Sequence, residues 1–225
     1  MHIDEVIARL HGLSDPEAAA GMARYRINPE HLLGISIPKL RGLAKELGQD
    51  HDLAAELWGS GLHEARVLAG MVDDPRLVDE AQLERWTYAF DSWDVCDGAV
   101  MNLFEDTSFA WSKTVEWSAA EPEFVKRAGF VLMARLAVSD KRAPDESFTP
   151  FFPIIKREST DERNFVKKAV NWALRQIGKR NLALHAAALT TAREIAELDS
   201  RSARWIAKDA LRELTSEAVL DRINR

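Results

Sequence analysis

Cysteine, long apolar runs and alternating strand patterns are nearly or wholly missing from this sequence. Cys96 is the only cysteine among 225 residues, which excludes a disulfide framework, and no Cys/His cluster has the spacing of a zinc site. No apolar run approaches the ~20 residues that a membrane-spanning helix needs. The first residues, MHIDEVIARL, lack the basic and then apolar pattern of a secretory signal. We therefore expect a cytoplasmic protein that crosses no membrane and needs no metal ion.

The charge of the chain is small in total but unevenly distributed. Lys and Arg number 30 and Asp and Glu number 36, which gives a net charge of −6. Residues 1–120 carry 10 basic and 21 acidic residues, a net of −11, whereas residues 121–180 carry 13 and 8, a net of +5. The cationic middle is either a surface for an anionic ligand or a partner for the acidic half. Scattered solvated charges are the plain alternative.

Helical periodicity runs through almost the whole chain. Apolar residues recur at three- and four-residue spacing, and no segment shows convincing strand alternation. Stops such as WGSGLHE, VDDPRL and DKRAPDE divide the chain into about a dozen helices of ordinary length. Because there is no low-complexity segment and no linker, we predict an all-α protein with a single domain over residues 1–225.

Three of the predicted helices resemble one another. Aligned without gaps, they place Arg66, Arg127 and Lys168 in one column, at intervals of 61 and 41 residues. Degenerate helical pairs of this length favour a HEAT-like α-solenoid, in which one helix of each pair lines a concave, here cationic, surface. A plain helical bundle is the less favoured alternative.

The helix in ERNFVKKAVNWALRQIGKR has two contrasting sides. At 100° per residue, one side holds the predicted core positions Val166, Ala169, Val170, Ala173, Leu174 and Ile177. The opposite side holds Lys168, Trp172, Arg175 and Lys179. Such a stripe can bind phosphates through its cations and offer Trp172 to a base or sugar. Alternatively, Trp172 packs under the cationic side chains or against a neighbouring helix.

The stretch DSWDVCD predicts the start of another helix, because the residues before Trp93 are good N-caps. Trp93 and Asp97 are then four residues apart and share a face. Asp94 is expected to be a surface charge that favours the helix N-terminus, and Cys96 a small core residue. Taken alone, this pattern favours a core tryptophan beside an acid in a salt bridge.

Arg127 lies in a predicted helix, EFVKRAGFVLMARLAV, that is apolar nearly all round. A semi-buried guanidinium requires a carboxylate or phosphate partner. Asp97 is a candidate, provided that the two helices face the same cleft. The pair would then be either part of a binding site or a structural ion pair.

Four motifs together resemble the AlkD-like DNA alkylation repair family, the HEAT-like repeat DNA glycosylases. The motifs are LLGISIPKLRGLAKEL, SWDVCD, FVKRAGF and FVKKAVNWALRQIGK, and they occur in the family's order over most of the chain. The resemblance implies that Asp97 is the catalytic carboxylate and that Trp93 and Trp172 flank the lesion-bearing nucleotide. It also implies that Arg127 contacts a backbone phosphate near the lesion.

Further DNA-facing residues follow from the resemblance and from the cationic stripe: Lys168, Arg175, Lys179 and, by a weaker match, Tyr25. The implied activity is hydrolysis of the N-glycosidic bond of N3- or N7-alkylated, positively charged purines in double-stranded DNA. The implied enzyme is a monomer that uses no metal and no redox cofactor. Two other functions remain open: a non-catalytic module that binds damaged or branched DNA, and a protein-interaction scaffold.

Overall fold

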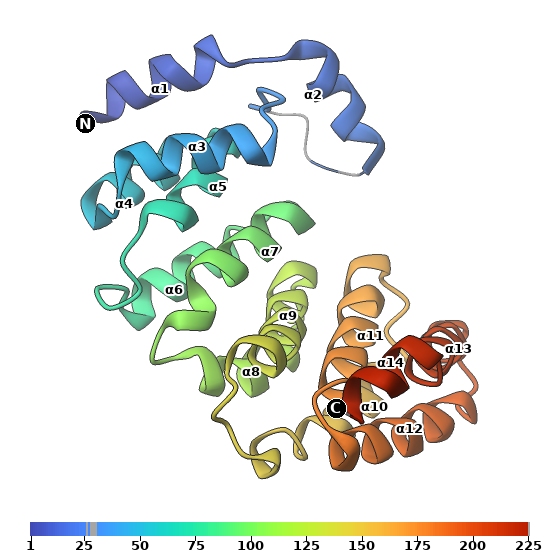
Figure 1. The fold of residues 1–225 in the computed structure, drawn as a ribbon. Coiled ribbons are helices and arrows are strands. Elements are labelled where there is room, and N and C mark those ends of the chain that lie inside the picture. The colour runs from blue at the N-terminus through green and yellow to red at the C-terminus, as the bar shows by residue number, and fades with distance from the viewer. Residues whose placement is uncertain (26, 28–30, 225) are drawn as a thin grey trace. The chain divides into compact units, whose positions relative to one another are not determined.

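The computed structural model describes residues 1–25, 27 and 31–224 (Figure 1). Within these residues the chain forms 14 α-helices and three short 3₁₀ helices and contains no strand, which confirms the prediction of an all-α fold. The chain divides into two compact units, Met1–Ala110 and Trp111–Arg225. The prediction that these units make up one domain stays a prediction.

The helices of the first unit are short and follow one another closely. They are α1 Ile3–Gly12, α2 Pro16–Met22, η1 Ala23–Tyr25, α3 Ile37–Leu47, α4 His51–Gly59, α5 His63–Val72, α6 Glu80–Tyr88, α7 Trp93–Asn102 and η2 Phe104–Asp106. Helix α5 packs against α3, α4 and α7 and is the most buried helix of this unit.

The second unit contains the longest helices of the chain. They are α8 Ala110–Ser118, α9 Glu123–Ser139, η3 Asp145–Ser147, α10 Phe151–Glu158, α11 Asn164–Gly178, α12 Leu182–Ala196, α13 Arg201–Leu214 and α14 Glu217–Ile223. Helix α11 packs against α9 on one side and against α12 and α13 on the other.

Several helices begin where a polar side chain caps them. The carboxylates of Asp50 and Asp79 accept hydrogen bonds from the third amide beyond them, at 3.0 and 2.7 Å. Asn181 and Ser200 do the same at the starts of α12 and α13, at 3.0 and 3.2 Å. Each cap satisfies an amide that would otherwise lack a partner in the first helical turn, and this explains why the helices begin at these residues.

Aromatic side chains fill the core of the first unit. The rings of Trp58 and Trp86 stack with centroids 4.2 Å apart and planes only 4° apart. Phe90 and Phe104 pack around them. Cys96, on α7, is fully buried, as predicted. Burial of such large apolar surfaces is the main force that holds short helices together.

In the second unit, the predicted core face of α11 is confirmed, because all six of its apolar positions are buried. Helix α9 runs beside α11 and is buried on nearly every side. Gly129 of α9 allows this close packing: a Cβ atom there would lie 2.5 Å from the amide nitrogen of Ser118 at the end of α8. Only glycine fits at this position without a shift of the backbone.

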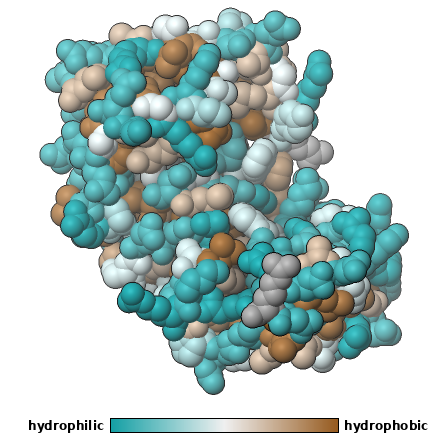
Figure 2. Space-filling model, viewed as in Figure 1, coloured by the Kyte–Doolittle hydropathy of each residue, from teal (hydrophilic) through white to brown (hydrophobic). Residues whose placement is uncertain are grey.

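The face of the molecule in Figure 2 is mostly hydrophilic, with apolar residues in small groups between the polar ones. None of the helices in the described part of the chain is long and apolar enough to cross a membrane.

Candidate functional site

Helix α7 begins at Trp93 with Ser92 as its N-cap, as the sequence predicted. One helical turn separates Trp93 from Asp97, so their side chains lie on the same face. Both residues are half-buried, and Trp93 is therefore not a member of the buried core. The indole N–H of Trp93 donates a hydrogen bond to the backbone carbonyl of Tyr25, at 3.0 Å. This bond fixes the orientation of the ring at the partly exposed end of α7.

Tyr25 lies in η1, and 69% of the residue's surface is exposed. The sequence placed Tyr25 near the site as a side chain that contacts DNA. The structure places its main-chain oxygen against Trp93 and leaves the ring open to solvent. Tyr25 therefore supports Trp93 through its backbone carbonyl.

Asp94 is not the surface charge that the sequence suggested, and that prediction was wrong. Only 16% of its side chain is exposed, and its carboxylate lies 2.9 Å from Nε2 of His63, which is itself 5% exposed. His63 begins α5, so this pair joins α5 to the first turn of α7. Sequence periodicity could not find the pair, because 31 residues separate its members.

Each partner of this pair shifts the pKa of the other. Burial alone would lower the pKa of His63, but the hydrogen bond and the negative charge of Asp94, together with nearby Glu64 and Asp91, raise it above its usual value. Burial alone would raise the pKa of Asp94, but the hydrogen bond and charge of His63 lower it. Each partner therefore stabilises the charged form of the other, an imidazolium beside a carboxylate.

A cavity of about 360 Å³ lies beside this pair in the first unit, and most of its lining is apolar. The lining residues are Ala18, Met22, Ile27, Gly34, Ile35, Ser36, Ile37, Leu40, His63, Glu64, Val67, Trp93 and Asp94. Buried Glu64 accepts hydrogen bonds from the amides of Leu33, Gly34 and Ile35, at 2.9, 2.6 and 3.1 Å. The Glu64 carboxylate therefore holds the turn before α3 and is fully used by the backbone.

Arg127 is buried, with 6% of its surface exposed, as its apolar helix predicted. Its guanidinium donates a hydrogen bond to the carbonyl oxygen of Phe165 in the first turn of α11, at 2.7 Å. This contact ties α9 to α11. Since Arg127 belongs to the second unit and Asp97 to the first, their suggested pairing stays a prediction.

The stripe on α11 does not have one uniform environment. Lys168 is exposed and Trp172 is half-buried. Arg175 and Lys179 are half-buried and pair with Glu213 of α13, Lys179 at 2.6 Å. The two cations that the sequence assigned to phosphates therefore have a carboxylate between them already.

Other contacts join the same two helices. Arg175 also lies 3.8 Å from Asp209, and the amide of Asn171 donates to Asp209 at 2.7 Å. Burial alone would raise the pKa of Glu213, but the hydrogen bonds from Lys179 and Arg175 lower it. The sequence gave no sign of this network, because its acids lie 34 to 38 residues after its cations.

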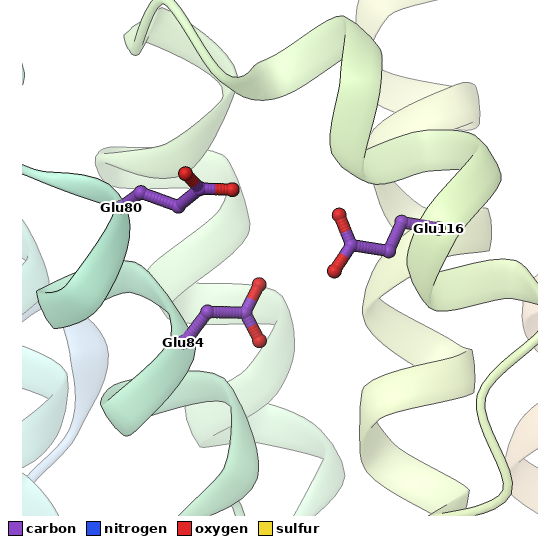
Figure 3. Close-up of side chains that lie close together, drawn as sticks. All are labelled: Glu80, Glu84 and Glu116. Atoms are coloured by element: carbon purple, nitrogen blue, oxygen red, sulfur yellow. The ribbon is translucent and has the colours of Figure 1, made fainter.

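Figure 3 labels three glutamates, two from the first unit and one from the second. Glu80 and Glu84 lie on successive turns of α6, and Glu116 lies on α8. The carboxylate of Glu116 accepts a hydrogen bond from the buried Lys113, at 2.7 Å. A lysine ammonium therefore already balances the charge of Glu116.

Comparison with known structures identifies the class of the fold. A solved structure, described as representing a new family of proteins related to the HEAT-like repeat DNA glycosylases with affinity for branched DNA structures, matches with a TM-score of 0.79. The identity is 19%, and the match covers 95% of each chain. The fold is therefore that of the HEAT-like repeat DNA glycosylases, which confirms the predicted HEAT-like solenoid.

The family follows from the sequence as a whole. A model of the DNA alkylation repair enzyme family matches residues 6–214. The chain therefore belongs to the DNA alkylation repair enzyme family, as its four motifs indicated. No curated protein sequence matches the chain significantly.

Proposed function

We propose that this protein is a DNA glycosylase that removes N3- or N7-alkylated purines from double-stranded DNA. The observation that carries the proposal is the shared face of Trp93 and Asp97 on α7. Both side chains are half-buried, and the hydrogen bond to Tyr25 holds the indole in place. A rigid aromatic ring beside a carboxylate suits a substrate that is cationic both as a base and as a sugar in the transition state.

The reaction requires little from the protein. Alkylation gives the purine a positive charge, so the base leaves with the electrons of the N-glycosidic bond as a neutral molecule. Positive charge then builds on the sugar, and the Asp97 carboxylate stabilises it. Water attacks C1′ of the sugar and loses one proton to Asp97. The products are the free alkylated base and an abasic site.

The remaining predicted residues receive supporting roles in this proposal. Trp93 and Trp172 flank the modified nucleotide, Arg127 contacts a phosphate beside it, and Lys168 contacts the DNA backbone. Arg175 and Lys179 take part only where a phosphate competes with Glu213 for them, since that carboxylate already binds both. Tyr25, whose side chain is exposed and whose backbone carbonyl accepts the hydrogen bond from Trp93, contacts the DNA in this scheme.

The test is base release from a duplex treated with a methylating nitrosourea. The wild type should release 3-methyladenine and 7-methylguanine, and Asp97→Asn should reduce the rate by about 10²- to 10³-fold, as for loss of one electrostatic transition-state contact. Asp106→Asn is the matched control, because Asp106 is an exposed acid of the same unit. A wild-type protein that is folded and binds DNA but releases no base contradicts the proposal.

A second candidate function is a non-catalytic module for damaged or branched DNA. The solved structure that shares this fold is described as having affinity for branched DNA, and that likeness favours the candidate. In this case Asp97→Asn should leave both DNA binding and its salt dependence unchanged, and no base should be released by any variant. The same set of proteins therefore separates the two functions.

A further inference from the structure

One exposed face of α13 carries four cations and a tryptophan. Arg201, Arg204, Trp205, Lys208 and Arg212 are all exposed, and their spacing of three and four residues aligns them along the helix. We call these five residues the α13 stripe. The opposite face, which includes Ala203, Ile206, Ala207, Ala210 and Leu214, is buried.

Two cations of the α13 stripe form salt bridges with acids, and the other two form none within the described residues, although the charge of Arg201 also acts on the carboxylate of Glu162. Arg204 lies 3.1 Å from Asp199, and Arg212 pairs with Asp209. Arg201 and Lys208 make no hydrogen bond or salt bridge to an acid within the described residues. Arg201 also occupies the first position of α13, where the helix dipole disfavours a positive charge.

Trp205 is the aromatic residue of this face, and 40% of it is exposed. The ammonium of Lys167, from α11, lies 5.3 Å from the centroid of its ring. A shallow hollow of about 180 Å³ lies against the ring and is also lined by Lys208, Asp209 and Arg212. At ~30 Å³ for each water, this space holds about six water molecules. The hollow therefore leaves room for a flat group on the ring.

The contacts between α11 and α13 explain why the α13 stripe matters. Glu213 and Asp209 of α13 bind Arg175 of α11, so the second half of the α11 stripe is largely neutralised. Helices α11 and α13 pack against each other (Figure 1), and Lys167, at the start of α11, contacts the ring of Trp205. The available positive charge therefore lies along α13 and the start of α11.

We propose that the α13 stripe binds an unpaired stretch of DNA, with one base stacked on Trp205 and phosphates on Arg201 and Lys208. This inference rests on the proposed DNA-directed function and names a second contact surface for it. A tryptophan face between cations is suited to single strands, because bases inside a duplex are already stacked and cannot reach it. From Arg201 to Arg212 the helix rises about 16 Å. At a rise of ~3.4 Å per nucleotide, this length matches about five nucleotides.

The experiment measures the binding of three fluorescently labelled DNAs by anisotropy: a single strand, a forked duplex with unpaired arms, and a blunt duplex. Trp205→Ala should weaken binding of the single strand and the fork by about 5- to 150-fold, the range for loss of one stacked base. Trp205→Phe keeps a ring and should restore most of the affinity. Binding of the blunt duplex should change less than about 2-fold, because its bases do not contact the ring.

The cations are tested separately from the ring. The double variant Arg201→Gln, Lys208→Gln should reduce the slope of log K against log salt for the single strand by about 1.4, because it loses two phosphate contacts at about 0.7 each. Arg193→Gln is the control, since Arg193 is an exposed cation on α12 of the same unit. An unchanged slope in the double variant contradicts the assignment of phosphates to this surface.

Two outcomes overturn the inference about Trp205. One is that Trp205→Ala binds all three DNAs like the wild type. The other is that Trp205→Ala, with an unaltered circular dichroism spectrum, loses affinity for all three DNAs equally. Base release from the methylated blunt duplex is measured on the same variants. If the wild type releases base but Trp205→Ala binds the fork as the wild type does, only the inference about Trp205 is overturned. If Trp205→Ala weakens fork binding but the wild type releases no base, only the proposed glycosylase activity is overturned.

Discussion

Removing the carboxylate that faces His63 should destabilise the protein by an amount that depends on pH. In Asp94→Asn, the imidazole of His63 stays 95% buried but loses its charged partner at 2.9 Å. A hydrogen bond to a charged group contributes about 1.5–3 kcal/mol, and an unpaired buried polar group costs a similar amount. We therefore expect a loss of about 2–3 kcal/mol near pH 5.5. For a chain of this length, that corresponds to a fall in Tm of roughly 4–12 °C.

The pH dependence follows from the directions of the two pKa shifts. The folded-state pKa of His63 is raised, so its contribution is complete below the usual value of 6.5 and is lost as the pH rises through the folded value. The folded-state pKa of Asp94 is lowered, so its contribution is present above 3.8 and is lost as the pH falls through the folded value. The pair therefore stabilises the protein most between about pH 4 and 6.5.

The assay is thermal unfolding followed by circular dichroism at pH 5.5 and pH 9, with the wild type, Asp94→Asn and the control Asp106→Asn. The difference in Tm between the wild type and Asp94→Asn should be largest at pH 5.5 and smaller at pH 9, because the contribution of the His63 charge is lost as the pH rises through its raised folded-state pKa. Asp106→Asn should match the wild type at both values. A Tm difference that is equal at both pH values, or larger at pH 9, refutes the reasoning.

Three further predictions concern packing, charge and the candidate site. Gly129→Ala should lower the free energy of unfolding by at least about 1–3 kcal/mol in urea titrations, because its Cβ would lie 2.5 Å from the amide of Ser118. Gly42→Ala is the control: it has open space around it in α3 and should raise the free energy of unfolding by up to ~1 kcal/mol. Glu213→Gln should strengthen DNA binding and steepen the salt slope by up to about 1.8, because it releases two cations of α11. Unaltered affinity in filter binding would contradict that second prediction. Trp93→Phe should keep the stacking surface but lose the hydrogen bond that fixes the ring. Base release should therefore slow in single-turnover assays. Affinity for the duplex should stay within about 3-fold of the wild type, which is at the low end of the change in affinity expected for the loss of one neutral hydrogen bond.

Much of the local structure could be predicted from the sequence because local periodicity determines it. The core face of α11 and the start of α7 at Trp93 follow from spacing and capping within a few residues. The burial of Arg127 follows from a helix that is apolar on nearly every side. The α13 stripe could have been found in the same way, because its cations and Trp205 are spaced three and four residues apart in the sequence.

What the sequence did not predict depends on contacts between distant segments. Asp94 looked like a surface acid at a helix start, and only the fold places His63 against it. Arg175 and Lys179 looked like free phosphate-binding cations, and only the packing of α13 on α11 supplies Glu213 between them. In both cases the sequence identifies a charged side chain but not its environment. The partner of that side chain belongs to another helix, which local spacing does not specify.

The central claim is that Asp97, and not its neighbour Asp94, is the catalytic carboxylate. The two acids lie in the same helix, and exchanging each for asparagine changes the same charge. Single-turnover release of 7-methylguanine from methylated duplex DNA, measured below the melting temperature of both variants, compares them directly. We expect Asp94→Asn to release base at close to the wild-type rate and Asp97→Asn to be slower by about 10²- to 10³-fold. Equal rates for Asp97→Asn and the wild type would contradict the account.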